Sequence, residues 1–141
     1  MKSLKLIAGC VLMLCVLACD IALDFRHTDY EDTMIWVWEN IEYTLDGEDN
    51  NWQTPKETLD LMTGDCEDMT FLFMYLVKED FGMKGEFVVV YAEGYGYHAL
   101  SIINGVYYDP THRETYIDLP DGWVEIERKS YDISMAMTLW Y

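Results

Sequence analysis

The sequence predicts an α+β domain because the spacing of its apolar residues changes once along its 141 residues. Before Gly82 these residues recur at helical spacing between helix-capping signals, and after Gly82 they recur with a period of two. Helices therefore come first and antiparallel strands follow, which is typical of an α+β fold. The length suits a single domain.

Two helices are predicted before residue 65. Thr28 and Glu31 have the spacing of a capping box ahead of an amphipathic helix over 29–45. Its apolar stripe would be Ile35, Trp38, Ile41 and Leu45. Thr54–Glu57 repeats the start signal, with Pro55 at the first helical position, so a short helix is expected to end near Gly64.

A third helix is predicted to begin at Cys66, capped by Asp65, and to end at Gly82. Its core stripe would be Met69, Leu72, Phe73 and Leu76. We expect this helix to pack on the sheet.

The strands are predicted after Gly82. Glu86–Ala92 is rich in valine and Tyr97–Ile103 alternates, while Asn104 and Gly105 form a two-residue turn into Val106–Asp109. A later strand is predicted at Trp123–Glu127, and 134–140 fits a strand or a helix.

Composition excludes some classes of function. Apolar residues make up 51% of the chain, enough for a folded core. The formal net charge is −17, from 26 acidic and 9 basic side chains, which repels phosphate backbones and argues against a nucleic-acid partner. Anionic membrane surfaces would be repelled in the same way, so membrane attachment would require a covalent anchor.

The N-terminus offers such an anchor. Lys2 and Lys5 precede an apolar run over 6–17 that is too short to span a bilayer, and the run ends at Leu17-Ala18-Cys19. This tripeptide resembles the lipobox of bacterial lipoproteins, in which the cysteine is acylated. The predicted division is a lipoprotein signal peptide over 1–18, a tether over 19–28 and a folded domain over 29–141. The expected location is the bacterial cell envelope, with the domain facing the periplasm or the exterior.

Cys66 would then be the one thiol left in the folded domain. A helix N-terminus favours a thiolate there, whereas Asp65, Glu67 and Asp68 oppose it, so a charged imidazole partner is needed. The alternative is that Cys66 is only a small buried apolar residue.

The hairpin register supplies that partner. A turn at Asn104-Gly105 places His98 and Asp109 on one face as diagonal neighbours, with Cβ atoms roughly 7–8 Å apart. Leu100 and Ile102 share this face and need burial, so we expect the Cys66 helix to cover it. Cys66, His98 and Asp109 would then form a nucleophile, a base and a base-orienting carboxylate.

Four segments together resemble the transglutaminase-like cysteine peptidase superfamily of bacteria. They are Trp52–Leu59, Gly64–Asp68, Tyr97-His98-Ala99 and Tyr108–Thr111. The resemblance implies a papain-like α+β core, with Cys66 as nucleophile, His98 as general base and acid, and Asp109 as its orienter. Gln53, or else Trp52, would stabilise the oxyanion beside the Cys66 N–H. The domain is short for this superfamily, so no substrate specificity carries over.

The remaining candidates have weaker roles. His27 and His112 are not expected to act directly. Tyr95 and Tyr97 would form either a rim beside the site or an exposed hairpin tip. The acidic residues Asp65, Glu67 and Asp68 fit helix capping and solvation better than calcium binding, and no metal or cofactor is expected.

The sequence therefore predicts a membrane-tethered thiol hydrolase that cleaves peptide or isopeptide amides. Its partner would be a protein or peptide substrate, and the oligomeric state is left open. A crosslinking transglutaminase and a catalytically silent binding lipoprotein are the alternatives. In the enzyme, the Cys66 thiolate should persist well below the unperturbed thiol pKa of about 8.5.

Overall fold

A computed structural model describes residues 29–47 and 52–130 of the chain. The predicted signal peptide and tether, Thr28 and the segment 134–140 lie outside these residues. The helices are α2 (Tyr30–Asn40), α3 (Pro55–Leu61) and α4 (Cys66–Phe81). The strands are β1 (Glu42–Tyr43), β2 (Thr63–Gly64), β3 (Glu86–Ala92), β4 (Gly96–Ile103), β5 (Val106–Asp109), β6 (Glu114–Tyr116) and β7 (Trp123–Ser130).

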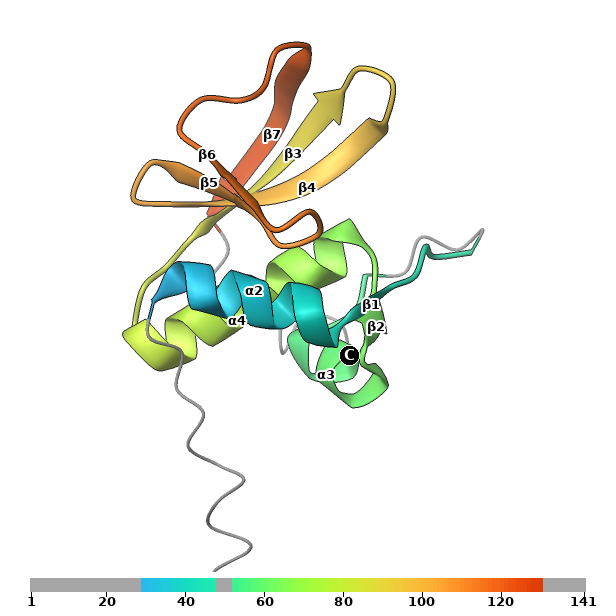
Figure 1. The fold of residues 1–141 in the computed structure, drawn as a ribbon, viewed down its shortest axis with the longest axis vertical. Coiled ribbons are helices and arrows are strands. Elements are labelled where there is room, and N and C mark those ends of the chain that lie inside the picture. The colour runs from blue at the N-terminus through green and yellow to red at the C-terminus, as the bar shows by residue number, and fades with distance from the viewer. Residues whose placement is uncertain (1–28, 48–51, 131–141) are drawn as a thin grey trace, which may run out of the picture.

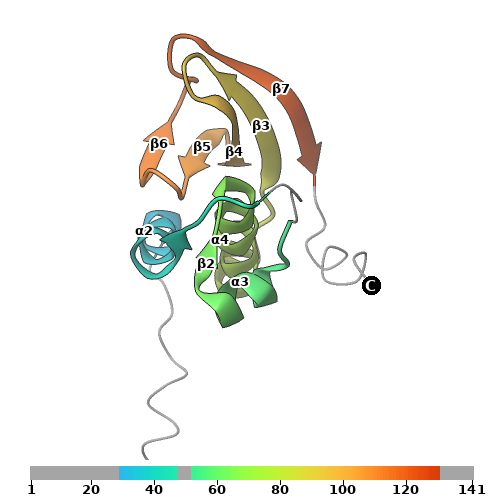
Figure 2. The ribbon, with the colours of Figure 1, turned by 90° about the vertical axis from the view of Figure 1, so that its right-hand side faces the viewer.

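Helices and an antiparallel sheet form separate layers, so the α+β class is confirmed. The five-stranded sheet has the order β6-β5-β4-β3-β7, and β1 and β2 form a small parallel pair. Figures 1 and 2 show the sheet on one side of α4, with α2 beside α4 and α3 at the side away from the sheet. The core lies between α4, α2 and the sheet, where the Tyr30 ring contacts Phe81 and Tyr108.

Helix α4 is the centre of this core and follows its predicted limits. It begins at Cys66 and is followed by Gly82, whose φ of 66° is the left-handed conformation that ends helices. Nearly every apolar side chain from Met69 to Val77 is buried, because α2, α3 and the sheet enclose the helix. Among the described residues, no helix is long and apolar enough to cross a membrane.

The prediction for the first helix was wrong in its end and in its buried stripe. Helix α2 stops at Asn40, since residues 42–44 turn away to bond with 62–64 in the β1–β2 pair. Its cap is Asp29, which accepts a hydrogen bond from the backbone N–H of Asp32 at 2.9 Å. The helix buries Thr33, Met34 and Val37. Of the predicted stripe, Ile41 is buried just after the helix, whereas Trp38 and Leu45 are exposed.

The second helix keeps its predicted start. Thr54 and Glu57 form the expected capping box, with Pro55 in the first turn. The helix ends at Leu61, before Gly64, because Met62 adopts a left-handed conformation at φ 56° and the chain then enters β2.

The predicted hairpin register is confirmed. Ile103 pairs with Val106, Ile102 with Tyr107 and Ser101 with Tyr108. Strand β3 has the predicted bounds, while β7 extends beyond Glu127 to Ser130 as it pairs with β3. The short edge strand β6 was not predicted, since its three residues carry no apolar alternation.

The sheet face covered by α4 is the opposite of the one predicted. Phe87, Ala99 and Ile103 pack against the helices, and Thr70 Oγ1 of α4 donates to the Ala99 carbonyl at 3.2 Å. The cluster with Leu100 and Ile102 is covered instead by sheet residues and by a loop, namely Tyr107, Leu119 and Trp123. Both faces of β4 are buried from His98 to Ile103, so the need to bury Leu100 does not identify the helix side.

Gly64 controls how closely β2 approaches the start of α4. A Cβ at Gly64 would lie 2.7 Å from the Cβ of Asp68. We predict that Gly64→Ala lowers the free energy of unfolding by about 1–3 kcal/mol, because the helix must shift to relieve the overlap. Denaturant titration measures this. Gly47→Ala is the matched control, since nothing lies within 4 Å of that position; equal effects of the two variants would contradict the prediction.

Candidate active site

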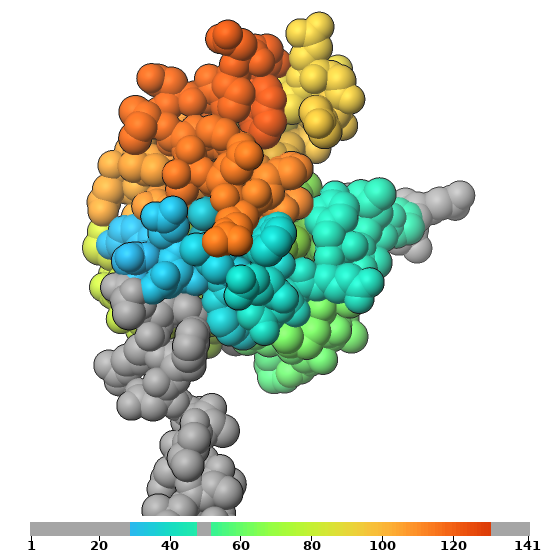
Figure 3. Space-filling model, in the orientation of Figure 1, coloured from blue at the N-terminus to red at the C-terminus, as the bar shows by residue number. Residues whose placement is uncertain are grey.

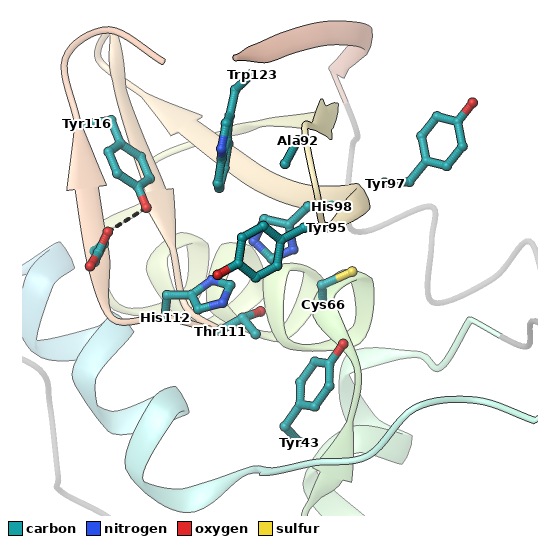
Figure 4. A pocket seen from close by; sticks show the side chains of 11 residues that line it. Tyr43, Cys66, Ala92, Tyr95, Tyr97, His98, Thr111, His112, Tyr116 and Trp123 are labelled. Carbon is teal, nitrogen blue, oxygen red and sulfur yellow. Dashed lines mark hydrogen bonds between the residues drawn. The ribbon is translucent and has the colours of Figure 1, made fainter. Parts of the chain in front are cut away.

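A cleft of about 580 Å³ opens where the N-terminus of α4 meets the sheet. Cys66 comes from α4, and His98, Thr111 and His112 come from β4 and the turn after β5. The rest of the lining is largely aromatic: Tyr43, Tyr95, Tyr97, Tyr116 and Trp123. In Figure 3 the β3–β4 turn and the segment after α2 stand out on the same side of the molecule, and Figure 4 shows the lining side chains around the hollow.

His98 and Asp109 are in direct contact. The Nε2 atom of His98 lies 2.8 Å from Oδ2 of Asp109, and the Asp109 side chain is fully buried. An ionised carboxylate accepts from Nε2–H, so the proton of a neutral ring lies on Nε2 and Nδ1 is left as the acceptor. The structure thus brings together the two residues that the hairpin register paired.

His112 is also bound to Asp109, although no direct role was expected for it. Its Nδ1 lies 2.9 Å from the same Oδ2, and its ring lies edge-on to His98 at 5.1 Å between centroids. The backbone N–H groups of Thr111 and His112 donate to Oδ1 at 3.1 Å each. The i,i+3 spacing of Asp109 and His112 across a proline turn is the sequence signal that could have indicated this contact.

These hydrogen bonds keep Asp109 ionised. Burial disfavours its carboxylate, but donation from His98 and then from His112 outweighs burial, and the pKa of Asp109 lies below its ordinary value. The buried negative charge can therefore orient the His98 ring at neutral pH.

The Cys66 thiol lies beside β4 but is turned toward Glu67. Its Sγ donates to Oε2 of Glu67 at 3.1 Å, and the backbone N–H of Ala99 points at the sulfur. Cys66 and His98 line the same cleft, yet no hydrogen bond joins them in this arrangement of the described residues. In Figure 4 the sulfur points away from the His98 ring.

This arrangement reverses the pKa shift expected for the thiol. Burial raises the pKa of Cys66, and the charge and hydrogen bond of Glu67 raise it further, while the Ala99 N–H opposes them. The prediction of a thiolate that persists below its ordinary pKa is thus wrong for this conformation. The reason is that the nearest proton acceptor is a carboxylate rather than the imidazole.

The acidic residues Asp68 and Glu67 near Cys66 make different contacts: Asp68 binds backbone N–H groups, and Glu67 binds the thiol. Asp68 is fully buried and accepts from the backbone N–H groups of Gln53 at 2.7 Å and Asp65 at 3.3 Å, so it secures the start of α4. Burial raises the pKa of Asp68 to about 6. Burial also raises the pKa of Glu67 to about 7, and its hydrogen bond with Asp65 adds to the rise.

Two groups in the described part of the chain have donor atoms close enough for a metal ion, within 4.8 Å of one another. The first is His98, Asp109 and His112, which are already joined by hydrogen bonds. The second is Asp65, Cys66 and Glu67. Asp68 of the predicted acidic cluster does not belong to it, because its oxygens cap the helix.

Gln53 lies away from the cleft lining. Its backbone N–H is bonded to Asp68, and its side-chain Oε1 is buried without a hydrogen-bond partner. Trp52, the other oxyanion candidate, packs on Phe71 and Phe87 in the core. An oxyanion role for Gln53 stays a prediction.

The sequence left open whether Tyr95 and Tyr97 form a rim beside the site or an exposed hairpin tip, and the structure shows features of both. They are 84% and 72% exposed at the β3–β4 turn, where Gly94 and Gly96 have φ values of 86° and 98°. Both also line the cleft, so the hairpin tip is exposed and borders the candidate site.

No protein-family model matches the sequence, and a search of curated proteins finds no match. Among solved structures, the chain is similar to the crystal structure of a "putative cysteine protease" from Cytophaga hutchinsonii, with a TM-score of 0.56 and 22% sequence identity. The match covers 72% of this chain and 37% of that protein. The chain thus has a cysteine-protease-like α+β fold, and it corresponds to well under half of the similar protein.

The raised pKa of Glu67 predicts a pH dependence of stability. A carboxyl whose pKa rises from 4.5 to about 7 on folding binds more protons when folded, so stability falls as pH increases between these values. We predict that Glu67→Gln reduces the loss of unfolding free energy between pH 5 and pH 8 by about 1–2 kcal/mol, allowing for screening. Denaturant titration at both pH values measures the effect.

Glu79→Gln is the control for this prediction, because Glu79 is an exposed residue of the same helix. It should retain the wild-type difference between pH 5 and pH 8. If Glu67→Gln also retains that difference, the Glu67 carboxyl does not hold its proton more tightly in the folded state.

Proposed function

We propose that this protein is a thiol hydrolase of the transglutaminase-like type, with a papain-like core, that cleaves peptide or isopeptide amides. The observation that carries the proposal is the hydrogen bond between buried Asp109 and His98 in the cleft that also contains Cys66. The fold similarity to a cysteine-protease structure supports the same class.

The chemistry follows from the roles that these groups can take. His98 Nδ1 accepts the proton of the Cys66 thiol, and the sulfur attacks the carbonyl carbon of the amide. Protonated His98 then donates to the leaving amine, and a thioester to Cys66 remains. A water that loses its proton to His98 attacks the thioester, which releases the carboxylic acid and restores the thiol. The backbone N–H of Cys66, in the first turn of α4, would stabilise the oxyanion.

Activation requires the thiol to leave Glu67. A rotation about the Cα–Cβ bond of Cys66 carries the sulfur away from Oε2, and protonation of Glu67 removes the charge that opposes the thiolate. Because the pKa of Glu67 is about 7, both states of this carboxyl are populated near neutral pH. Glu67 would therefore set the fraction of the protein that is ready to react.

Two other functions use the same residues. An amine in place of water would make the protein a crosslinking transglutaminase. A binding protein that kept the fold is favoured by one observation, the raised pKa of Cys66 in the present conformation. The dependence of activity on Cys66, His98 and Asp109 separates an enzyme from a binding protein.

Turnover of a fluorescent peptide library by the purified chain tests the roles of Cys66, His98 and Asp109. Cys66→Ala and His98→Ala should abolish cleavage. Asp109→Asn should lower kcat by about 10²–10⁴ with little change in KM, because it alters the tautomer and orientation of His98. Since Asp109 is fully buried with four hydrogen bonds, some loss of thermal stability should accompany this variant.

The matched control is Asp121→Asn, at an exposed turn residue, which should turn over peptides like the wild type. Cleavage that survives Cys66→Ala would reject the thiol mechanism. Product that forms only with an added amine would replace the hydrolase with a transferase.

The proposal includes membrane attachment through the N-terminus. A signal peptide over 1–18 would be removed, Cys19 acylated, and a tether over 19–28 would join the lipid to the domain at 29–141. The basic start at Lys2 and Lys5 and the Leu17-Ala18-Cys19 sequence support this division. The substrate would then be a protein or peptide at the bacterial cell envelope.

Metabolic labelling with a fatty-acid probe tests the anchor. We predict that Cys19→Ala abolishes labelling and releases the protein from the membrane fraction, since no basic patch would hold so acidic a chain there. Cys15→Ala is the control and should label normally. Unchanged labelling of Cys19→Ala would reject lipidation at that residue.

A further inference from the structure

The lining of the cleft contains an acidic side chain and no lysine or arginine among the described residues. None of the lysines and arginines among residues 29–47 and 52–130 lines it, whereas the carboxylate of Glu114 does. Several basic side chains have partners elsewhere: Lys56 with Asp60, Arg113 with the Trp38 ring, Arg128 with Glu125 and Lys129 with Glu127. An anionic substrate group would therefore meet no fixed positive charge in the cleft.

A carboxylate and an aromatic side chain meet in the lining of the cleft, where Glu114 contacts Tyr116. Glu114 accepts a hydrogen bond from the Tyr116 hydroxyl at 2.7 Å, and the Tyr116 ring lies 5.8 Å from that of Trp123. Trp123 in turn lies edge-on to His98 at 5.7 Å, which connects these side chains to the candidate catalytic residues. Figure 4 shows Tyr116, Trp123 and His98 on the same side of the hollow.

We propose that the cleft binds a lysine or arginine side chain of the substrate, with its cationic group at Glu114 beside Tyr116 and Trp123. Aromatic faces attract ammonium and guanidinium groups, and the Glu114 carboxylate would add a charge-assisted hydrogen bond. The inference rests on the proposed function, because it specifies the substrate of that same site.

The net charge of the chain and the aromatic residues at the cleft entrance favour the same class of substrate. The chain carries a net charge of −17, which attracts basic segments from a distance and repels acidic ones. Tyr95 and Tyr97, exposed at the hairpin tip, extend the aromatic surface to the cleft entrance. A neutral ligand that only stacks on the rings would use the aromatic faces but not Glu114.

Peptide binding to the full-length Cys66→Ala chain in detergent tests the inference without any need for turnover. The probes are three fluorescent peptides of one sequence, with lysine, norleucine or glutamate at the central position, measured by anisotropy. We expect the lysine peptide to bind about tenfold more tightly than the norleucine peptide, and the glutamate peptide to bind most weakly. The preference for lysine should shrink as salt is increased.

Glu114→Gln, introduced into Cys66→Ala, should remove most of the preference for lysine and leave the affinity for norleucine unchanged. Glu79→Gln, at the far end of α4, is the charge-matched control and should retain the preference. Equal affinities for lysine and norleucine, or a preference that survives Glu114→Gln, would overturn the inference. A lysine preference without peptide cleavage by the wild type would keep the inference and reject the hydrolase.

Discussion

The candidate site depends on one buried charge, the carboxylate of Asp109. Moving a carboxylate out of water is costly unless its oxygens are hydrogen-bonded, and Asp109 accepts from two imidazoles and from two backbone N–H groups. Two parts of the fold fix these donors: the β4–β5 register sets His98, and the turn after Pro110 sets Thr111 and His112. The sheet therefore orients the His98 ring before any substrate is present.

The candidate nucleophile, Cys66, comes from the helical layer, and the charges around it disfavour its ionised form. The start of α4 favours a thiolate through its free N–H groups, while Glu67 and Asp65 disfavour it through their charge. Glu67 accepts a hydrogen bond from the Cys66 thiol in the structure, so two bases are available for the thiol proton: a carboxylate on the same helix and an imidazole on the sheet. Because the pKa of Glu67 is about 7, this carboxyl changes its charge near neutral pH.

The sequence predicted α4, the β4–β5 register and the His98–Asp109 pair because each follows from local rules of capping, turn type and alternation. It did not predict which face of β4 meets α4, because both faces are apolar and the choice depends on how the whole chain packs. The contact of His112 and the turn of the thiol toward Glu67 likewise depend on side-chain placement in three dimensions. Apolar periodicity carries no information about the thiol, whereas the i,i+3 spacing of Asp109 and His112 across a proline turn could have indicated their contact.

In the proposed mechanism, His98 is oriented by Asp109 and accepts the proton of Cys66. The rate of alkylation by iodoacetamide at pH 6 tests it most directly, since most Glu67 is then protonated and no longer opposes the thiolate. Peptide mapping by mass spectrometry assigns the modification to Cys66. We expect His98→Ala to slow alkylation of Cys66 at least about tenfold at this pH, because the thiolate loses its cationic partner. Equal rates in the wild type and in His98→Ala would show that His98 does not activate Cys66 and leave Cys66 as an unactivated thiol.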